Sequence, residues 1–201
     1  MRILSVFAVL LILAAVAVSQ EFPRAEIFGG YSYGNFQILR TRSSLNGWNG
    51  SATVNIYRWF GLTTDFGGLY GGTATETVPN SPAIGGTTTL RENEKLHTIL
   101  FGPQFSYRRG KMSPFARVLI GEARITNSFS SVCNSCSGSF SLGTPIFIGV
   151  VSPSSVMTGV GVGFDYGFNK SLASRMQADY LQYGATDNVR ISTGIVFRVG
   201  K

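Results

Sequence analysis

The residues best suited to chemistry by type and spacing are Cys133 and Cys136, which form a C-x-x-C motif. Such a pair could be a thioredoxin-type redox centre or half of a zinc site. The surrounding segment, 131–137, is rich in Ser and Asn and predicts no helix whose N-terminus would activate a thiol. Zinc would need two more ligands, and the chain has two Cys and one His in all. The favoured interpretation is a local disulfide in a surface loop, in an oxidising compartment, with a modest stabilising effect because the ring is small.

His97 is the single histidine, so any Ser–His hydrolase built from this sequence would have to use it. No serine or acid stands at a spacing that would pair with His97 and orient it. We therefore expect His97 to lie at a strand end without a catalytic role. Glycine-rich stretches such as 159–163 fall within strand patterns and predict curvature rather than a phosphate-binding loop. The sequence predicts no catalytic residue, no cofactor and no metal site.

Ionic residues that alternate with apolar ones form a third group. Its members are Asp65, Glu122, Arg124, Asp165, Arg175, Asp179, Arg190 and Arg198. Residues two apart share one face of a strand, and we expect these side chains to face the interior of a sheet structure. An unpaired buried charge is costly, so acids and bases that meet there would pair. We expect Asp165, Arg175, Asp179 and Arg190, on three consecutive strands, to form a connected ionic network; a lining for ion passage is the alternative.

Glu122 and Arg124 stand in an ambiguous segment, 115–126. They share a face with the apolar Ala116, Val118 and Ile120, so either face of this strand could point inward. We expect Glu122 and Arg124 to point inward.

The elements that must position these residues are strands. The segment 189–199 carries apolar residues or Thr at every odd position, and Arg190, Ser192, Gly194 and Arg198 at even ones. A period of two places these sets on opposite faces of one extended strand. Eight segments of this kind are predicted, at about 25–35, 48–58, 62–70, 96–107, 115–126, 157–168, 172–180 and 189–199.

The connections between these segments alternate in length. Three are long, at 36–46, 72–94 and 127–156, and those between them are short. A barrel inserted in the outer membrane has short turns on the periplasmic side and long loops outside. The sequence therefore predicts an all-β, eight-stranded antiparallel up-and-down transmembrane β-barrel, with its apolar faces toward lipid and an interior filled by side chains.

Aromatic residues gather near the ends of the predicted strands, where we expect two girdles at headgroup depth. The outer girdle would hold Tyr31, Tyr33, Trp48 and Tyr70, and the periplasmic one Tyr57, Trp59, Phe60, Phe115, Phe168 and Phe197.

The first residues predict an export signal. Arg2 precedes a mostly apolar run, and the small residues Ala17 and Ser19 suit a signal-peptidase site. We expect a cleaved signal peptide at 1–19 and one barrel domain at 20–201. With 44% hydrophobic and only 13% charged residues, the chain is lean in charge for a soluble domain. Its net charge of +7 favours anionic lipid headgroups and lipopolysaccharide as partners, because an exported chain would not meet nucleic acid.

Several motifs resemble those of small OmpA-like outer-membrane β-barrel proteins of Gram-negative bacteria. They are IFGGYSY at 27–33, FGP at 101–103 before a basic turn, GVGFDY at 161–166, DY at 179–180 and VRISTGIVF at 189–197. The resemblance implies an eight-stranded barrel in the outer membrane, without enzymatic activity. The chain departs from the family in two ways. It lacks the peptidoglycan-binding domain of full-length OmpA proteins, and it ends at Lys201 rather than at an aromatic residue, so we expect Phe197 to substitute in the usual C-terminal assembly signal.

Four functions compete. The leading one is a structural or surface-interaction protein, expected to be a monomer, whose long loops meet the environment, lipopolysaccharide or a partner. The second is a narrow, porin-like pore or a transporter of small or hydrophobic solutes. The apolar stretch 146–151 is compatible with this alternative. The third is a lipid-modifying enzyme that uses His97, and the fourth a soluble secreted barrel with a ligand cavity.

Overall fold

The structure, a computed structural model, describes residues 22–38, 41–79, 87–134, 146–151, 154–184 and 186–200. The described part contains nine strands and no helix. They are β1 (Ala25–Ile38), β2 (Thr41–Asn55), β3 (Phe60–Pro79), β4 (Thr87–Ser106), β5 (Met112–Asn134), β6 (Ile146–Val151), β7 (Ser154–Gly167), β8 (Leu172–Tyr183) and β9 (Thr186–Val199).

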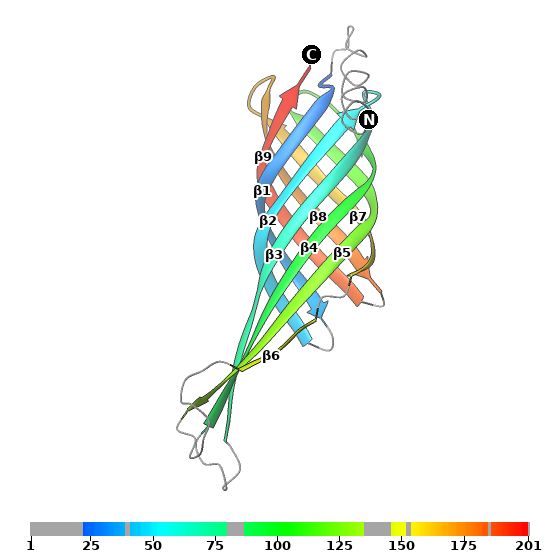
Figure 1. The fold of residues 1–201 in the computed structure, drawn as a ribbon. Coiled ribbons are helices and arrows are strands. Elements are labelled where there is room, and N and C mark those ends of the chain that lie inside the picture. The colour runs from blue at the N-terminus through cyan, green and yellow to red at the C-terminus, as the bar shows by residue number, and fades with distance from the viewer. Residues whose placement is uncertain are drawn as a thin grey trace, which may run out of the picture.

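Eight of these strands close into a barrel (Figure 1). Each pairs antiparallel with its neighbours in the chain, β7 follows β5 around the wall, and β1 pairs with β9 to complete the ring. The remaining strand, β6, pairs with β5 alone. The prediction of an eight-stranded antiparallel up-and-down barrel is confirmed.

The two ends of the barrel differ. At one end, called the turn end here, β1 begins, β9 ends, and tight turns at 56–59, 108–111 and 168–171 join the strands. Gly110 has a φ of 59° in the second turn, a conformation that a residue with a side chain adopts only at a cost. The opposite end is called the loop end.

Strands extend much further past the loop end than predicted. β3 and β4 remain paired from Ala74↔Glu92 to Pro79↔Thr87, beyond an irregularity after Gly71. β5 continues beside β4 as far as Asn134, and β6 adds to its other edge. These parts of β3–β6, residues 74–79, 87–92, 127–134 and 146–151, form a narrow sheet called the blade here, which projects from the barrel in Figure 1.

The blade corrects the predicted loops. Residues 72–94 and 127–156 were expected to be irregular, but most of their described residues lie in strands. Threonine recurs at 73–77 and 87–89, followed in the first segment by Val78, and β-branched residues favour extended backbone. The predicted connection 36–46 is also largely strand, because β1 and β2 stay paired as far as Ile38↔Thr41.

The wall places apolar side chains outside and polar ones inside. Val54, Phe164 and Ile195 are 43%, 43% and 38% exposed, whereas Asp165 and Arg190 are 2% and 1% exposed. This is the reverse of a soluble barrel, whose apolar face meets the core. No helix in the described part of the chain is long and apolar enough to cross a membrane.

The interior of the loop half holds an apolar cluster beside buried polar residues such as Glu94, Asn127 and Asn188. The cluster is called the plug here and consists of Phe36, Leu45, Leu69, Leu96, Leu100, Leu119, Ala123, Ile125, Met157 and Leu181. Leu100 is the register partner of the buried Asp65 on the neighbouring strand, so the plug begins directly beside the ionic part of the interior. The sequence predicted a filled interior, but not an apolar cluster within it.

Candidate functional site

The middle of the barrel holds four buried charges, called the central cluster here: Asp65 of β3, Arg117 of β5, Asp179 of β8 and Arg190 of β9. Arg117 Nε and Nη2 lie 2.9 and 2.8 Å from Asp179 Oδ1, and its Nη2 lies 3.1 Å from Asp65 Oδ2. Arg190 Nη2 lies 2.8 Å from Asp65 Oδ1 and 2.9 Å from Asp179 Oδ2. Each guanidinium thus bridges both carboxylates.

The central cluster is electrically balanced and further tied by amides. Two Arg face two Asp, so no net charge is buried there. Asn49 donates to Asp65 Oδ1 at 3.0 Å, and Gln177 donates to Asn49 Oδ1 at 2.8 Å. These hydrogen-bonded charges stabilise the barrel only while all partners are present. Removal of one partner leaves a charge unpaired in a medium of low dielectric constant.

A second group of charges, the lower cluster, lies between the central cluster and the turn end. Arg175 Nε lies 2.7 Å from Asp165 Oδ1, and its Nη2 lies 3.1 Å from Glu26 Oε2. Arg108 and Arg198 reach the same two carboxylates from the mouth of the barrel, at 2.9 Å to Glu26 and 3.3 Å to Asp165.

Two phenyl rings flank Arg175 in the lower cluster. Its guanidinium carbon lies 4.5 Å from the ring centre of Phe115 and 5.5 Å from that of Phe28, both close enough for cation–π attraction. Phe115 was expected in the periplasmic girdle. It is buried, so that expectation was wrong for this residue.

The predicted ionic residues divide between these two clusters. Asp165 and Arg175 lie in the lower cluster, Asp179 and Arg190 lie in the central one, and no ion pair between the two pairs is found among the described residues. Asp65 joins the central cluster, and Arg198 the lower one.

Arg117, Glu26 and Arg108 were missed as members. Strand parity could have found Arg117, because it alternates with the apolar Val118 and Ile120, which would face outward in such a barrel.

Glu122 and Arg124 point outward, so their inward prediction was wrong. Strand parity explains the error. Arg117, Leu119 and Ala123 occupy the inward positions of β5, which leaves Val118 and Ile120 outward together with Glu122 and Arg124. The apolar alternation in the first half of the strand was the correct guide, and the two charges continue that outer row toward the loop end.

The outer wall carries the single histidine. His97 is exposed, and its Nε2 lies 3.3 Å from the hydroxyl of Tyr70 rather than beside a serine. Tyr31, Tyr33 and Trp48 of the predicted outer girdle are exposed on the same half of the barrel. Tyr57, Trp59, Phe168 and Phe197 are exposed toward the turn end. Trp59 and Phe105 stack there, with ring centres 6.1 Å apart.

Two other predicted features fall partly or wholly outside the described residues. Cys133 lies in β5, whereas Cys136 is not among the described residues, so the disulfide stays a prediction. The signal peptide at 1–19 also lies outside them. Within the described part of the chain, no group of three or more His, Cys, Asp or Glu is placed to hold a metal ion.

Fold and interior define the class: a small, eight-stranded up-and-down barrel with an apolar wall and a polar interior. No family model and no curated protein matches the sequence. Solved structures do. Ail, the attachment invasion locus protein of Yersinia pestis, aligns over 88% of this chain and 99% of its own, with a TM-score of 0.58 and 14% identity. Neisserial surface protein A aligns over 89% and 99%, with a TM-score of 0.54 and 12% identity. At such identities the likeness establishes the fold, and membership of the OmpA-like family is not established.

Proposed function

We propose that the chain is an outer-membrane barrel protein of a Gram-negative bacterium that acts at the cell surface through its blade, without catalysis. The observation that carries the proposal is the combination of a sealed interior with the blade. The plug and the two ionic clusters occupy the interior, and the longest strands project beyond one end only.

The membrane location rests on the wall. Exposed apolar side chains on β1–β5 and β7–β9 surround the whole barrel, a surface that water would not tolerate but acyl chains would. Ail and neisserial surface protein A share the fold, and the first is named for attachment and invasion. The OmpA-like resemblance of the motifs at 27–33 and 161–166 agrees with the same location.

The proposed orientation places the blade outside the cell and the turn end in the periplasm, since outer-membrane barrels have short periplasmic turns. Exposed Lys95, His97 and Arg124 then lie on the outer wall toward the loop end, close to the Tyr70 ring. The two cations at this height, Lys95 and Arg124, suit the phosphates of lipopolysaccharide, which we propose as a contact of the wall together with membrane lipid. Such a contact would also explain why the charged side chain of Arg124 lies on the outer wall.

The filled interior disfavours the alternative function, a pore or transporter. Passage of an ion or a solute would require the plug to open, and ten buried apolar residues pack there. An eight-stranded barrel is just wide enough for side chains to fill its interior. We therefore expect no stable openings when the purified protein is inserted into planar bilayers.

The decisive experiment removes the blade and keeps the barrel. Replacing residues 72–93 by Asn-Gly joins Gly71 to Glu94, which are already register partners, through a two-residue hairpin turn. Residues 127–153 are replaced by a short Gly-Ser linker, because Thr126 lies two residues beyond the register pair Arg124↔Ser154 at the start of β7. Both forms should fractionate with the outer membrane and migrate faster in gels before heating than after.

Only the full-length form should be cut by protease added to intact cells and should promote attachment of those cells to matrix-coated surfaces. Equal attachment by the two forms would refute the role of the blade, and stable conductance would refute the sealed interior.

A further inference from the structure

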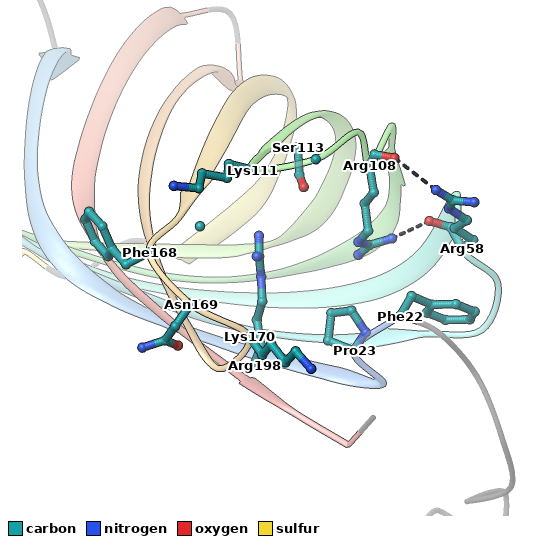
Figure 2. Close-up of a pocket in the computed structure, with 12 residues that line it drawn as sticks. Phe22, Pro23, Arg58, Arg108, Lys111, Ser113, Phe168, Asn169, Lys170 and Arg198 are labelled. Atoms are coloured by element: carbon teal, nitrogen blue, oxygen red, sulfur yellow. Dashed lines mark hydrogen bonds between the residues drawn. The ribbon is translucent and has the colours of Figure 1, made fainter.

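The mouth of the barrel at the turn end contains a cationic pocket with a volume of about 360 Å³ (Figure 2). Its lining comes from the chain entering β1, from the three tight turns and from the end of β9. Five of the lining residues carry positive charge: Arg58, Arg108, Lys111, Lys170 and Arg198. The volume falls in the range of about 300–1,000 Å³ that is typical of small-molecule sites.

The carboxylates beneath the pocket are already occupied. Glu26 accepts from Arg108 at 2.9 Å and from Arg175 at 3.1 Å, and Asp165 accepts from Arg175 at 2.7 Å and from Arg198 at 3.3 Å. Three guanidinium groups thus share two buried carboxylates, and positive charge is in excess even before the rim is counted.

The rim adds positive charge that no described carboxylate balances. Arg58, Lys111 and Lys170 form no ion pair with any residue in the described part of the chain. Each lies in one of the three tight turns, so the charges stand around the opening rather than on one side. Mutual repulsion of this kind destabilises an empty site and is relieved by an anion.

The turns hold these cations in place. Arg58 and Arg108 each donate to the backbone carbonyl of the other, as the dashed lines in Figure 2 mark. The Asn169 side chain accepts from the backbone N–H groups of Ser171 and Leu172, both at 2.8 Å, which fixes the turn that carries Lys170. A prearranged set of donors binds with a smaller entropic cost than a mobile one.

We propose that this pocket binds a phosphate-bearing anion. Phosphate offers several oxygens and up to two charges to donors that converge from different walls, and guanidinium groups match that geometry. The exposed rings of Trp59, Phe105 and Phe168 on the outer wall place this end of the barrel at a membrane interface. The phosphate could therefore belong to a lipid headgroup of the surrounding leaflet or to a soluble phosphate compound, and the test separates these sources.

The test uses the full-length protein in nanodiscs of phosphatidylcholine. In the first arm, inorganic pyrophosphate is titrated by calorimetry. In the second, phosphatidylglycerol is added to the nanodiscs, and the lipid retained on the protein is measured by native mass spectrometry. The variants are K111Q and the double variant K111Q/K170Q.

R109Q is the matched control, because Arg109 lies in the same turn and carries the same charge as Lys111 but does not line the pocket. Heat-dependent gel migration verifies that every variant is folded.

Wild type and R109Q should bind alike in at least one arm, and K111Q/K170Q should bind about tenfold more weakly. Binding of pyrophosphate would identify a soluble source, and retention of phosphatidylglycerol alone would identify a lipid. Absence of binding in both arms, or equal binding by K111Q/K170Q and R109Q, would overturn the proposal. The blade plays no part in this test, so its failure would leave the proposed surface function untouched.

Discussion

Replacement of Asp179 by Asn should destabilise the barrel more than any equally small change on its surface. Asp179 accepts five hydrogen bonds, three from Arg117 and two from Arg190. The substitution preserves size and shape but removes one negative charge. Asp65 then faces two guanidinium groups alone, and the central cluster carries an uncompensated positive charge.

The expected loss is about 3–5 kcal/mol in the free energy of unfolding, the usual result of removing one partner from a buried ion pair. Arg117 and Arg190 are each only 1% exposed, so solvent screens the excess positive charge poorly. A loss of this size is a large part of the stability of a domain, which is commonly about 5–15 kcal/mol.

The assay is reversible unfolding by denaturant of protein refolded into lipid vesicles, followed by tryptophan fluorescence and by heat-dependent gel migration. Asp187→Asn is the control, because this substitution makes the same chemical change at an exposed position of β9. A second variant, Arg117→Met combined with Asp179→Leu, removes a balanced pair and should recover part of the loss. If D179N unfolded within about 0.5 kcal/mol of D187N, the ordinary range for surface substitutions, the reasoning about the cluster would be refuted.

Three other substitutions test separate features by the same unfolding and gel assays. Leu119→Ala leaves a cavity in the plug and should cost about 2–5 kcal/mol; a smaller change would mean that the plug is loosely packed. Gly30→Val should prevent closure of β1 on β9 and abolish the heat-dependent band, because a Cβ at Gly30 would lie 2.2 Å from the carbonyl oxygen of Thr193. Glu122→Gln, on the outer wall, should change the free energy of unfolding by less than about 0.5 kcal/mol. A loss of several kcal/mol would mean that this side chain lies in the interior after all.

Period-two alternation was enough to predict the barrel where each strand had one plainly apolar face. In β9, the apolar Ile191 and Ile195 stand at odd positions and Arg190 and Ser192 at even ones, and the structure places the first pair outside and the second inside, as predicted. β5 lacked that contrast. Arg117 and Glu122 have opposite parity, so only one of them could point inward, and the partner that decides between them, Asp179, lies 62 residues away from Arg117 in the chain.

The blade and the plug were missed for different reasons. Residues 72–79 and 87–92 alternate weakly in hydropathy, so pairing between them could not be separated from a loop by pattern alone. Leu69, Leu100 and Leu119 do occupy inward positions, but sequence does not show that side chains from separate strands meet at one height of the barrel. The boundaries of the signal peptide at 1–19 and of the domain at 20–201 stay predictions.

The central cluster has a consequence for biogenesis. Its members come from β3, β5, β8 and β9, and Asp65 and Arg190 are 125 residues apart. Until β9 docks, Asp65 and Asp179 would each lack their contact with Arg190, in a barrel that is still open to the bilayer. A partly paired sheet would therefore be unstable in the bilayer. The central cluster would stabilise the protein only once β9 has paired with β1 and closed the barrel. Insertion and ring completion should thus occur as one cooperative event, and a chain truncated before β9 should fail to remain in the membrane at all.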